Sequence, residues 1–154
     1  MRSLLIFSIT LVFISSIIAS QLIQPENEIR IYIENSVPYV GTEIPRMDGM
    51  NGNGIKIAVI DTGVDFNHPD LFGWGPNGKV IGGHNFVQPN QLPMDNNGHG
   101  TKVAGIIAAD GNILGVANKA KILAYKVSED GEGVSSELIS MVVVMITTGY
   151  FGIA

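Results

Sequence analysis

The sequence predicts an α/β fold built on a parallel sheet, from two apolar runs and the segment between them. Residues 55–60 (Ile-Lys-Ile-Ala-Val-Ile) form a short apolar run, typical of a strand that is buried in a parallel sheet. Residues 121–127 form a second such run. Between the two runs, the small residues of 99–109 suit a tightly packed helix. A strand, a helix and a strand in this order make one right-handed crossover unit.

Two further regions complete the expected elements. A short strand pair is expected near Val80–Ile81 and Asn85–Val87. Residues 135–140 begin like a helix, whereas Met141–Ile146 predicts a strand. A crossover between parallel strands takes about a dozen residues or more, so this helix would be too short for one. The tail 138–154 also carries no charged residue. It is either a strand exposed by truncation, a membrane-seeking segment or out-of-frame translation, and the last interpretation is favoured.

Residues 1–20 predict a secretory signal peptide. Arg2 gives a short basic start, residues 4–18 are apolar apart from Ser and Thr, and Ala19 and Ser20 are small enough for a cleavage site. An uncleaved membrane anchor is the alternative, because the apolar stretch is near the lower limit of a span, about 17 residues. The expected location is therefore extracellular, or membrane-anchored if the segment is retained.

Composition narrows the class of protein. The chain has 154 residues, of which 45% are hydrophobic and 15% charged, as in a globular protein of one domain. A net charge of -5 without a basic patch gives no indication of a nucleic-acid partner. The absence of cysteine excludes a disulfide framework, thiol catalysis and a cysteine zinc site.

A carboxylate and an imidazole stand at two informative places. Asp61 follows the first apolar run, at the sheet edge where open α/β folds place their chemistry. His99 opens the predicted helix. Taken alone, Asp61 would be interpreted first as a structural residue in the turn after a strand. In Asp-Thr-Gly it could also belong to an aspartic protease, with 113–115 as the second signal of that class.

Five short motifs decide between these interpretations. They are Asp-Thr-Gly-Val-Asp (61–65), His-Pro-Asp-Leu (68–71), His-Gly-Thr (99–101), Leu-Gly-Val-Ala (114–117) and Ala-Lys-Ile-Leu-Ala-Tyr-Lys-Val (120–127). In this order they resemble the subtilisin-like serine proteases over roughly residues 38–137. The resemblance implies a three-layer α/β subtilisin-like parallel sheet with flanking helices, here truncated. It also implies a spacer at 21–33 and an incomplete peptidase domain over 34–154.

The resemblance implies a serine endopeptidase with an Asp-His-Ser triad. His99 would be the general acid–base, because an imidazole with an ordinary pKa of about 6.5 exchanges protons near neutral pH. Asp61 would orient the imidazole and stabilise its charged form. None of the serines after His99 lies in a Gly-Thr-Ser-Met-Ala-like turn, and the expected nucleophile would follow the histidine by roughly 150 residues. We therefore expect these residues alone to be inactive.

The resemblance also implies binding residues. Asn97 matches a position that flanks the cleft, and Gly131, Glu132 and Gly133 resemble a strand edge that binds an extended peptide. Asp70 matches a calcium ligand of other members, but the loop that would complete the site is short here. No cofactor is required by the expected chemistry, and calcium at Asp70 is the alternative.

Two non-catalytic functions stay open. The chain could bind peptides, or complement a separate C-terminal half that supplies the serine. It could also be a membrane-tethered interaction protein that uses its apolar ends. In each case the expected partner is a peptide or protein rather than a nucleic acid.

Overall fold

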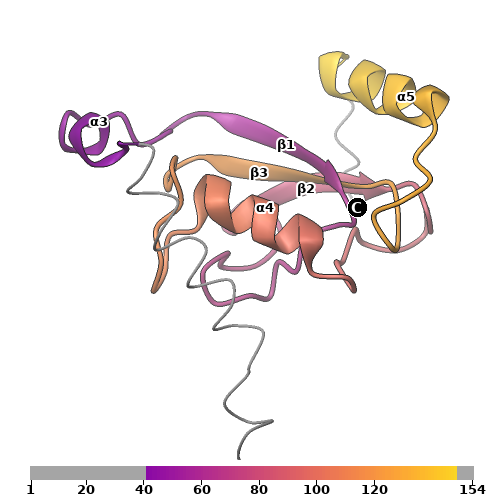
Figure 1. The fold of residues 1–154 in the computed structure, drawn as a ribbon, viewed down its shortest axis with the longest axis horizontal. Helices are drawn as coiled ribbons and strands as arrows, with labels where there is room; N and C mark the ends of the chain where they lie inside the picture. The colour runs from indigo at the N-terminus through magenta and orange to yellow at the C-terminus, as the bar shows by residue number, and fades with distance from the viewer. Residues whose placement is uncertain (1–40, 149–154) are drawn as a thin grey trace, which may run out of the picture. The chain divides into compact units, whose positions relative to one another are not determined.

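The computed structural model describes residues 41–148, which all belong to one compact unit, 33–154. The predicted signal peptide, the spacer 21–33 and the start of the predicted peptidase domain at residue 34 all lie outside the described residues. A short helix α3 (Glu43–Met47) precedes the sheet. The other elements are β1 (Lys56–Asp61), β2 (Val80–Asn85), α4 (His99–Ala108), β3 (Lys121–Lys126) and α5 (Ser136–Thr147), shown in Figure 1.

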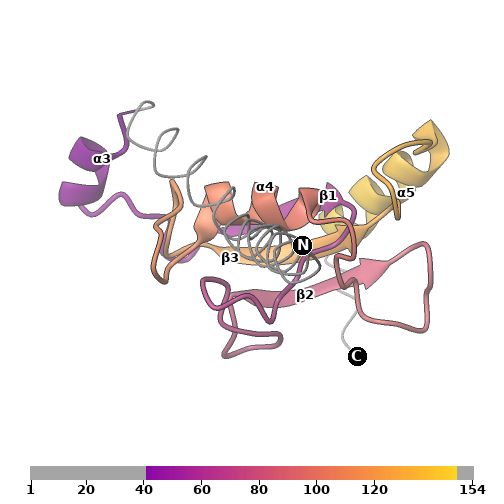
Figure 2. The same cartoon turned by 60° about the horizontal axis from the view of Figure 1, so that its bottom comes forward.

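The three strands form a parallel sheet in the order β1-β3-β2. Lys56 pairs with Lys121 at one end of β1, and Asp61 pairs with Lys126 at the other. The prediction of two buried parallel strands joined through a helix is confirmed, because β1 and β3 are neighbours and α4 lies between them in sequence. Figure 2 shows α4 lying alongside this sheet.

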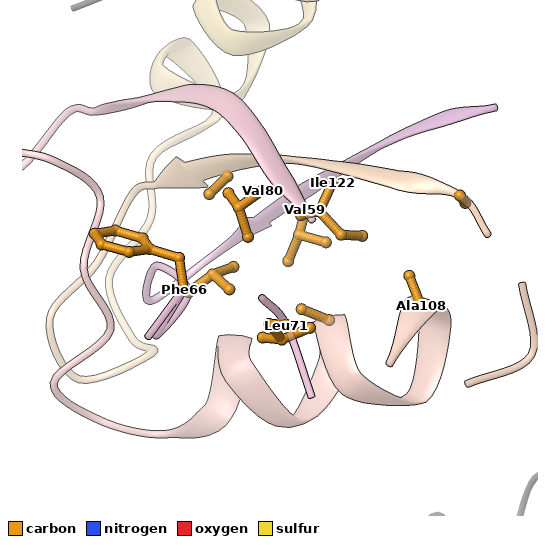
Figure 3. Close-up of a cluster of buried hydrophobic side chains, with 10 residues drawn as sticks. Val59, Phe66, Leu71, Val80, Ala108 and Ile122 are labelled. Atoms are coloured by element: carbon orange, nitrogen blue, oxygen red, sulfur yellow. The ribbon is translucent and has the colours of Figure 1, made fainter. Parts of the chain in front are cut away.

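One face of the sheet packs against α4. Val59 of β1 and Ile122 of β3 lie in a buried cluster with Ala104 and Ala108 of the helix (Figure 3). Leu71, from the loop after β1, is 1% exposed in the same cluster. The small residues expected for a tightly packed helix therefore allow α4 to approach the sheet closely, which positions the start of the helix beside the end of β1.

The opposite face packs against α5. Leu123 and Tyr125 of β3, which alternate with the residues facing α4, form a second cluster with Val142. Leu138 and Ile146 are half-buried against it. Helix, sheet and helix make three layers, so the predicted α/β architecture is confirmed over the described residues.

The predicted strand over Met141–Ile146 is wrong, because these residues are helical. The side-chain oxygen of Ser135 accepts a hydrogen bond from the backbone N–H of Leu138 (3.2 Å) and caps the helix. Leu138, Val142 and Ile146 follow one another at intervals of four residues, so helical geometry places all three on the buried face. Packing along this face outweighs the β propensity of the valines.

The predicted pair of short strands is also wrong, because Val80–Asn85 is one strand. Gly82 and Gly83 lie between the two strands that were expected. In the structure a Cβ atom at Gly83 would overlap the backbone of Ala124, so the glycine lets β2 approach β3. The register shifts between Val80 and Gly82, which accommodates this approach.

Among the described residues, 41–148, no helix has both the length and the apolar character needed to cross a membrane.

Candidate functional site

Asp61 and His99 meet at the carboxyl end of the sheet. Nδ1 of His99 lies 2.8 Å from Oδ1 and 2.9 Å from Oδ2 of Asp61. The Asp61 side chain is 15% exposed, whereas that of His99 is 65% exposed. The carboxylate is thus enclosed by protein, and the imidazole that it holds is open to a molecule arriving from solvent.

Asp61 is the last residue of β1, and its backbone oxygen accepts a hydrogen bond from the N–H of Val127 (2.9 Å). His99 is the first residue of α4. The two can meet because Gly100 has no side chain: a Cβ atom there would overlap the carbonyl oxygen of Gly63 and would lie 3.0 Å from the Cβ of Asp61. Glycine in the His-Gly-Thr motif therefore permits the contact between helix and strand end.

The first backbone N–H groups of α4 are all paired. Side chains outside the helix accept the first three of these hydrogen bonds, and the fourth goes to a backbone carbonyl. The pairs are His99 N to Asn97 Oδ1 (3.2 Å), Gly100 N to Thr62 Oγ1 (3.0 Å), Thr101 N to Asp95 Oδ2 (2.9 Å) and Lys102 N to Gly98 O (3.1 Å). The start of the helix is therefore tied to the loop before it and to the residue after Asp61.

A cavity of about 140 Å³ adjoins the pair. Asp61 and His99 line it together with Ser128 and Gly131. Among the described residues that line this cavity, Ser128 is the one serine, but its hydroxyl is occupied by the turn that follows. It lies 2.8 Å from Oδ1 of Asp130 and accepts the N–H of Gly131 (2.9 Å). Ser128 is thus a turn-forming residue, whose hydroxyl is engaged by Asp130, Gly131 and the backbone oxygen of Glu132.

Of the four predicted binding residues, the structure connects Asn97 and Gly131 with the site but not Glu132 and Gly133. Asn97 reaches the backbone oxygen of Asp130 with its Nδ2 (3.4 Å), and Gly131 lines the cavity. Glu132 and Gly133 are exposed but are not among the lining residues. The segment 130–133 is a loop and not the strand edge that the resemblance suggested, because hydrogen bonds within its own turn take up part of its backbone.

Two carboxyl groups near the site have altered acidity. Burial raises the pKa of Asp95, but hydrogen bonds from Thr101, Gly98 and Asn97 lower it by more, so the net pKa lies below the ordinary value of 3.8. The N–H of Glu132 and the hydroxyl of Ser128 lower the pKa of Asp130. Both groups are therefore held as acceptors of hydrogen bonds.

The surroundings of Asp70 do not fit calcium. The carboxylate is buried, and its Oδ1 accepts the backbone N–H of Asn112. Oδ2 lies 3.9 Å from Nδ1 of His68. Within residues 41–148, no group of three or more His, Cys, Asp or Glu residues could hold a metal ion, whereas calcium takes about six to eight oxygen ligands. Asp70 instead joins its own loop to the turn after α4.

Three residues at the site were not singled out from the sequence. Thr62, Asp95 and Thr101 are buried polar residues that connect the end of β1 to the start of α4. An available signal was the position of Asp95, a few residues ahead of a predicted helix, where a carboxylate can accept hydrogen bonds from helix N–H groups. The contact with Thr62, 33 residues away in sequence, had no local signal.

Comparison with known proteins agrees with this geometry. Residues 52–149 match the Subtilase family, peptidase S8. Thermitase of Thermoactinomyces vulgaris is 49% identical over 87 residues, which cover 54% of this chain and 29% of thermitase. The thermophilic serine proteinase of Bacillus sp. (strain AK1) is 44% identical over 102 residues, or 63% of this chain and 24% of that protein.

The minor extracellular protease Vpr of Bacillus subtilis (strain 168) is 40% identical over 125 residues, or 75% of this chain and 15% of Vpr. The chain thus spans less than a third of the length of each of these relatives. The family match covers well over half of the chain and includes both Asp61 and His99. The chain belongs to the subtilase family.

Proposed function

We propose that this chain supplies the aspartate and the histidine of a serine endopeptidase. The observation that carries the proposal is the hydrogen bond between Nδ1 of His99 and the carboxylate of Asp61, at 2.8 Å, beside a cavity. A carboxylate accepts and does not donate, so Nδ1 carries the proton. Nε2 of the same ring is then left as the proton acceptor.

In the proposed reaction Nε2 of His99 takes the proton of a serine hydroxyl as its oxygen attacks the carbonyl carbon of the scissile peptide bond. Asp61 stabilises the positive charge that develops on the ring. When the tetrahedral intermediate collapses and the C–N bond breaks, Nε2 returns the proton to the leaving amine. A water molecule then attacks the acyl carbon and gives a proton to Nε2, which returns it to the serine oxygen as the bond between that oxygen and the acyl carbon breaks.

On this proposal the nucleophile comes from residues outside the 154 printed here, because no serine after His99 lies in a Gly-Thr-Ser-Met-Ala-like turn and Ser128, which lines the cavity, is bonded within its own turn. Loss of the serine costs on the order of a million-fold in turnover in a subtilisin, a member of the same family. We therefore expect these residues by themselves to have no peptidase activity. The serine could lie on the same polypeptide or on a separate C-terminal half.

The substrate in this proposal is an extended peptide that enters along the loop 130–133. Gly131 lines the cavity beside His99, and Asn97 joins that loop to the residues before α4. Asn97, Gly131, Glu132 and Gly133 would contact the acyl side of the substrate, with exposed backbone groups available for hydrogen bonds.

Secretion is part of the proposal. The signal-like residues 1–20 support it, as does the extracellular relative from Bacillus subtilis. On this proposal residues 21–33 form a spacer, and 34–154 belong to the peptidase domain, including the apolar segment 138–154. Out-of-frame translation was the favoured interpretation of that segment, but the family match continues to residue 149 and contains most of it, which supports the peptidase domain instead.

A chimera tests the proposed roles. Residues 52–148 would replace the matching segment of the Bacillus sp. (strain AK1) serine proteinase, and hydrolysis of a peptide substrate would be measured. We expect activity that His99→Ala and Asp61→Ala each abolish, and Ser128→Ala leaves within about tenfold. A folded chimera in which His99→Ala keeps full activity would remove His99 from the reaction.

Labelling with a fluorophosphonate separates the remaining possibilities. The probe reacts with an activated serine, so the chain alone should stay unlabelled. Labelling that appears only after mixing with the serine-bearing part of the relative would indicate complementation. Without labelling in the mixture, but with binding of an extended peptide to the chain, the function would be peptide binding.

A further inference from the structure

Asp95 is a buried carboxylate close to Asp61 and His99. It is 8% exposed and accepts five hydrogen bonds from protein groups. Its Oδ1 accepts the hydroxyl of Thr62 and the N–H groups of Asn97 and Gly98, each at 2.9 Å. Its Oδ2 accepts the N–H and the hydroxyl of Thr101. The negative charge thus lies among the dipoles at the start of α4, which stabilise it.

The segment that ends in Asp95 is held from three directions. Each of the three residues before it accepts a hydrogen bond on its backbone oxygen, and each donor comes from a different part of the sheet. The donors are Asn85 Nδ2 at the end of β2 (to Leu92, 3.2 Å), Val64 N after β1 (to Pro93, 2.9 Å) and Lys126 Nζ at the end of β3 (to Met94, 3.0 Å). The carboxylate therefore has a fixed position relative to all three strand ends.

Thr62 connects Asp95 to the pair. Its hydroxyl oxygen lies 2.9 Å from Oδ1 of Asp95 and 3.3 Å from Oδ1 of Asp61, and it accepts the N–H of Gly100 at 3.0 Å. A hydroxyl has one proton to donate. The shorter distance directs that proton to Asp95, so Oδ1 of Asp61 is left for His99 and for the backbone N–H of Thr62 (2.7 Å).

We propose that Asp95 is a positioning residue for the Asp61–His99 pair. It fixes the start of α4, which carries His99, and it holds the hydroxyl of Thr62 away from the oxygen of Asp61 that His99 uses. Asp95 touches neither the ring of His99 nor the cavity, so it acts through its neighbours. The inference rests on the proposed function, in which the Nδ1 proton of His99 must stay on the side of Asp61.

The test follows that proton in the full chain by NMR, with ¹⁵N-labelled histidine. The exchange of the Nδ1 proton with water and the ¹⁵N shifts of the ring report whether Asp61 holds the imidazole. We expect Asp95→Asn to speed the exchange at least about tenfold, the scale of one hydrogen bond to a charged group. Asp70→Asn is the matched control, because Asp70 is also a buried carboxylate that accepts a backbone N–H, but away from His99.

Thr62 gives a second pair of variants that does not remove the carboxylate. Thr62→Val deletes, at nearly constant shape, the hydroxyl that accepts the N–H of Gly100 and joins it to Asp95. Because the start of α4 loses this tie, we expect the same faster exchange. Thr62→Ser keeps the hydroxyl, so exchange should stay at the wild-type rate. If Asp95→Asn unfolds the chain, the comparison of Thr62→Val with Thr62→Ser tests the proposal instead. Both Thr62 variants keep the hydrogen bonds from α4 to Asp95, so we expect them to stay folded.

The possible outcomes are distinct. Wild-type exchange rates and ring shifts in both folded Asp95→Asn and Thr62→Val would overturn the positioning role and leave the proposed function standing. A folded wild-type chain without a protected Nδ1 proton would instead contradict the Asp61–His99 pair itself. Faster exchange in Asp95→Asn and Thr62→Val, with no change in Asp70→Asn and Thr62→Ser, would support the proposal.

Discussion

Replacing Gly100 by alanine should separate the catalytic geometry from the stability of the fold. A Cβ atom at this position would overlap the carbonyl oxygen of Gly63, and it would lie 3.0 Å from the Cβ and 3.1 Å from Oδ1 of Asp61. The overlapping atom belongs to the backbone and cannot rotate away. The start of α4, which carries His99, must therefore move away from the end of β1.

The size of the effect follows from these contacts. Relief of the overlap takes a movement of roughly 1 Å, which would stretch the 2.8 Å contact between His99 and Asp61 beyond hydrogen-bonding distance. Misplacement on this scale lowers turnover on the order of 100-fold. The cost in stability is smaller: overpacking costs about 1–3 kcal/mol, and alanine gains about 1 kcal/mol over glycine in a helix.

The assay compares kcat/KM of the chimera with its unfolding in urea, followed by circular dichroism. Gly82→Ala is the matched control, because a Cβ atom there meets Leu123 at an ordinary 3.6 Å and should change neither quantity much. We expect Gly100→Ala to lose activity on the order of 100-fold while it stays folded. Activity within threefold of the wild type would refute the reasoning that α4 must approach this closely.

Three further predictions follow from other contacts. Asp95 has a pKa below 3.8 in the folded chain, so its contribution to stability is present above that value and is lost as the pH falls through the folded pKa. The free energy of unfolding of Asp95→Asn, measured in urea between pH 5 and 2, should therefore depend less steeply on pH than that of the wild type. Equal slopes would contradict this. Val142 is fully buried between α5 and β3, so Val142→Ala should lower the free energy of unfolding by about 2 kcal/mol. Val144 is exposed, so Val144→Ala should change it by less than about 0.5 kcal/mol. Similar losses in both variants would show that α5 does not pack in this way. Ser128→Ala removes the hydroxyl that accepts the N–H of Gly131, so the amide protons of the loop 130–133 should exchange faster with water. The fluorophosphonate labelling of the chimera should stay unchanged. A loss of labelling would mean that Ser128 reacts with the probe.

The sequence was a good guide to the elements that carry the chemistry. The apolar runs of β1 and β3 and the small residues of α4 are local signals, and each element formed within about a residue of its expected bounds. Asp61 and His99 stand at the ends of these elements, so their approach could be expected from the topology. The contact itself depends on the helix closing onto the strand, which Gly100 permits.

The sequence was a poor guide where distant contacts decide the structure. The valines of α5 favour a strand by propensity, but burial of Leu138, Val142 and Ile146 on one face selects the helix. Gly82 and Gly83 lie between the two strands expected from the sequence, and only the backbone of β3 explains why glycine is needed in a continuous strand. Asp95 resembles an ordinary loop residue until the fold brings it to Thr62.

The strand order β1-β3-β2 has a consequence for how the chain folds during synthesis. β1 and β2 are made first, but both pair with β3 and not with each other. Neither has its partner until residues 121–126 have left the ribosome, so the sheet forms late and in one step around its central strand. Asp61 and His99 are both synthesised earlier, yet the strand end that orients Asp61 is completed only when Lys126 pairs beside it. A ribosome-stalled series of lengths should therefore gain protease resistance abruptly, and only after the whole of β3 has emerged.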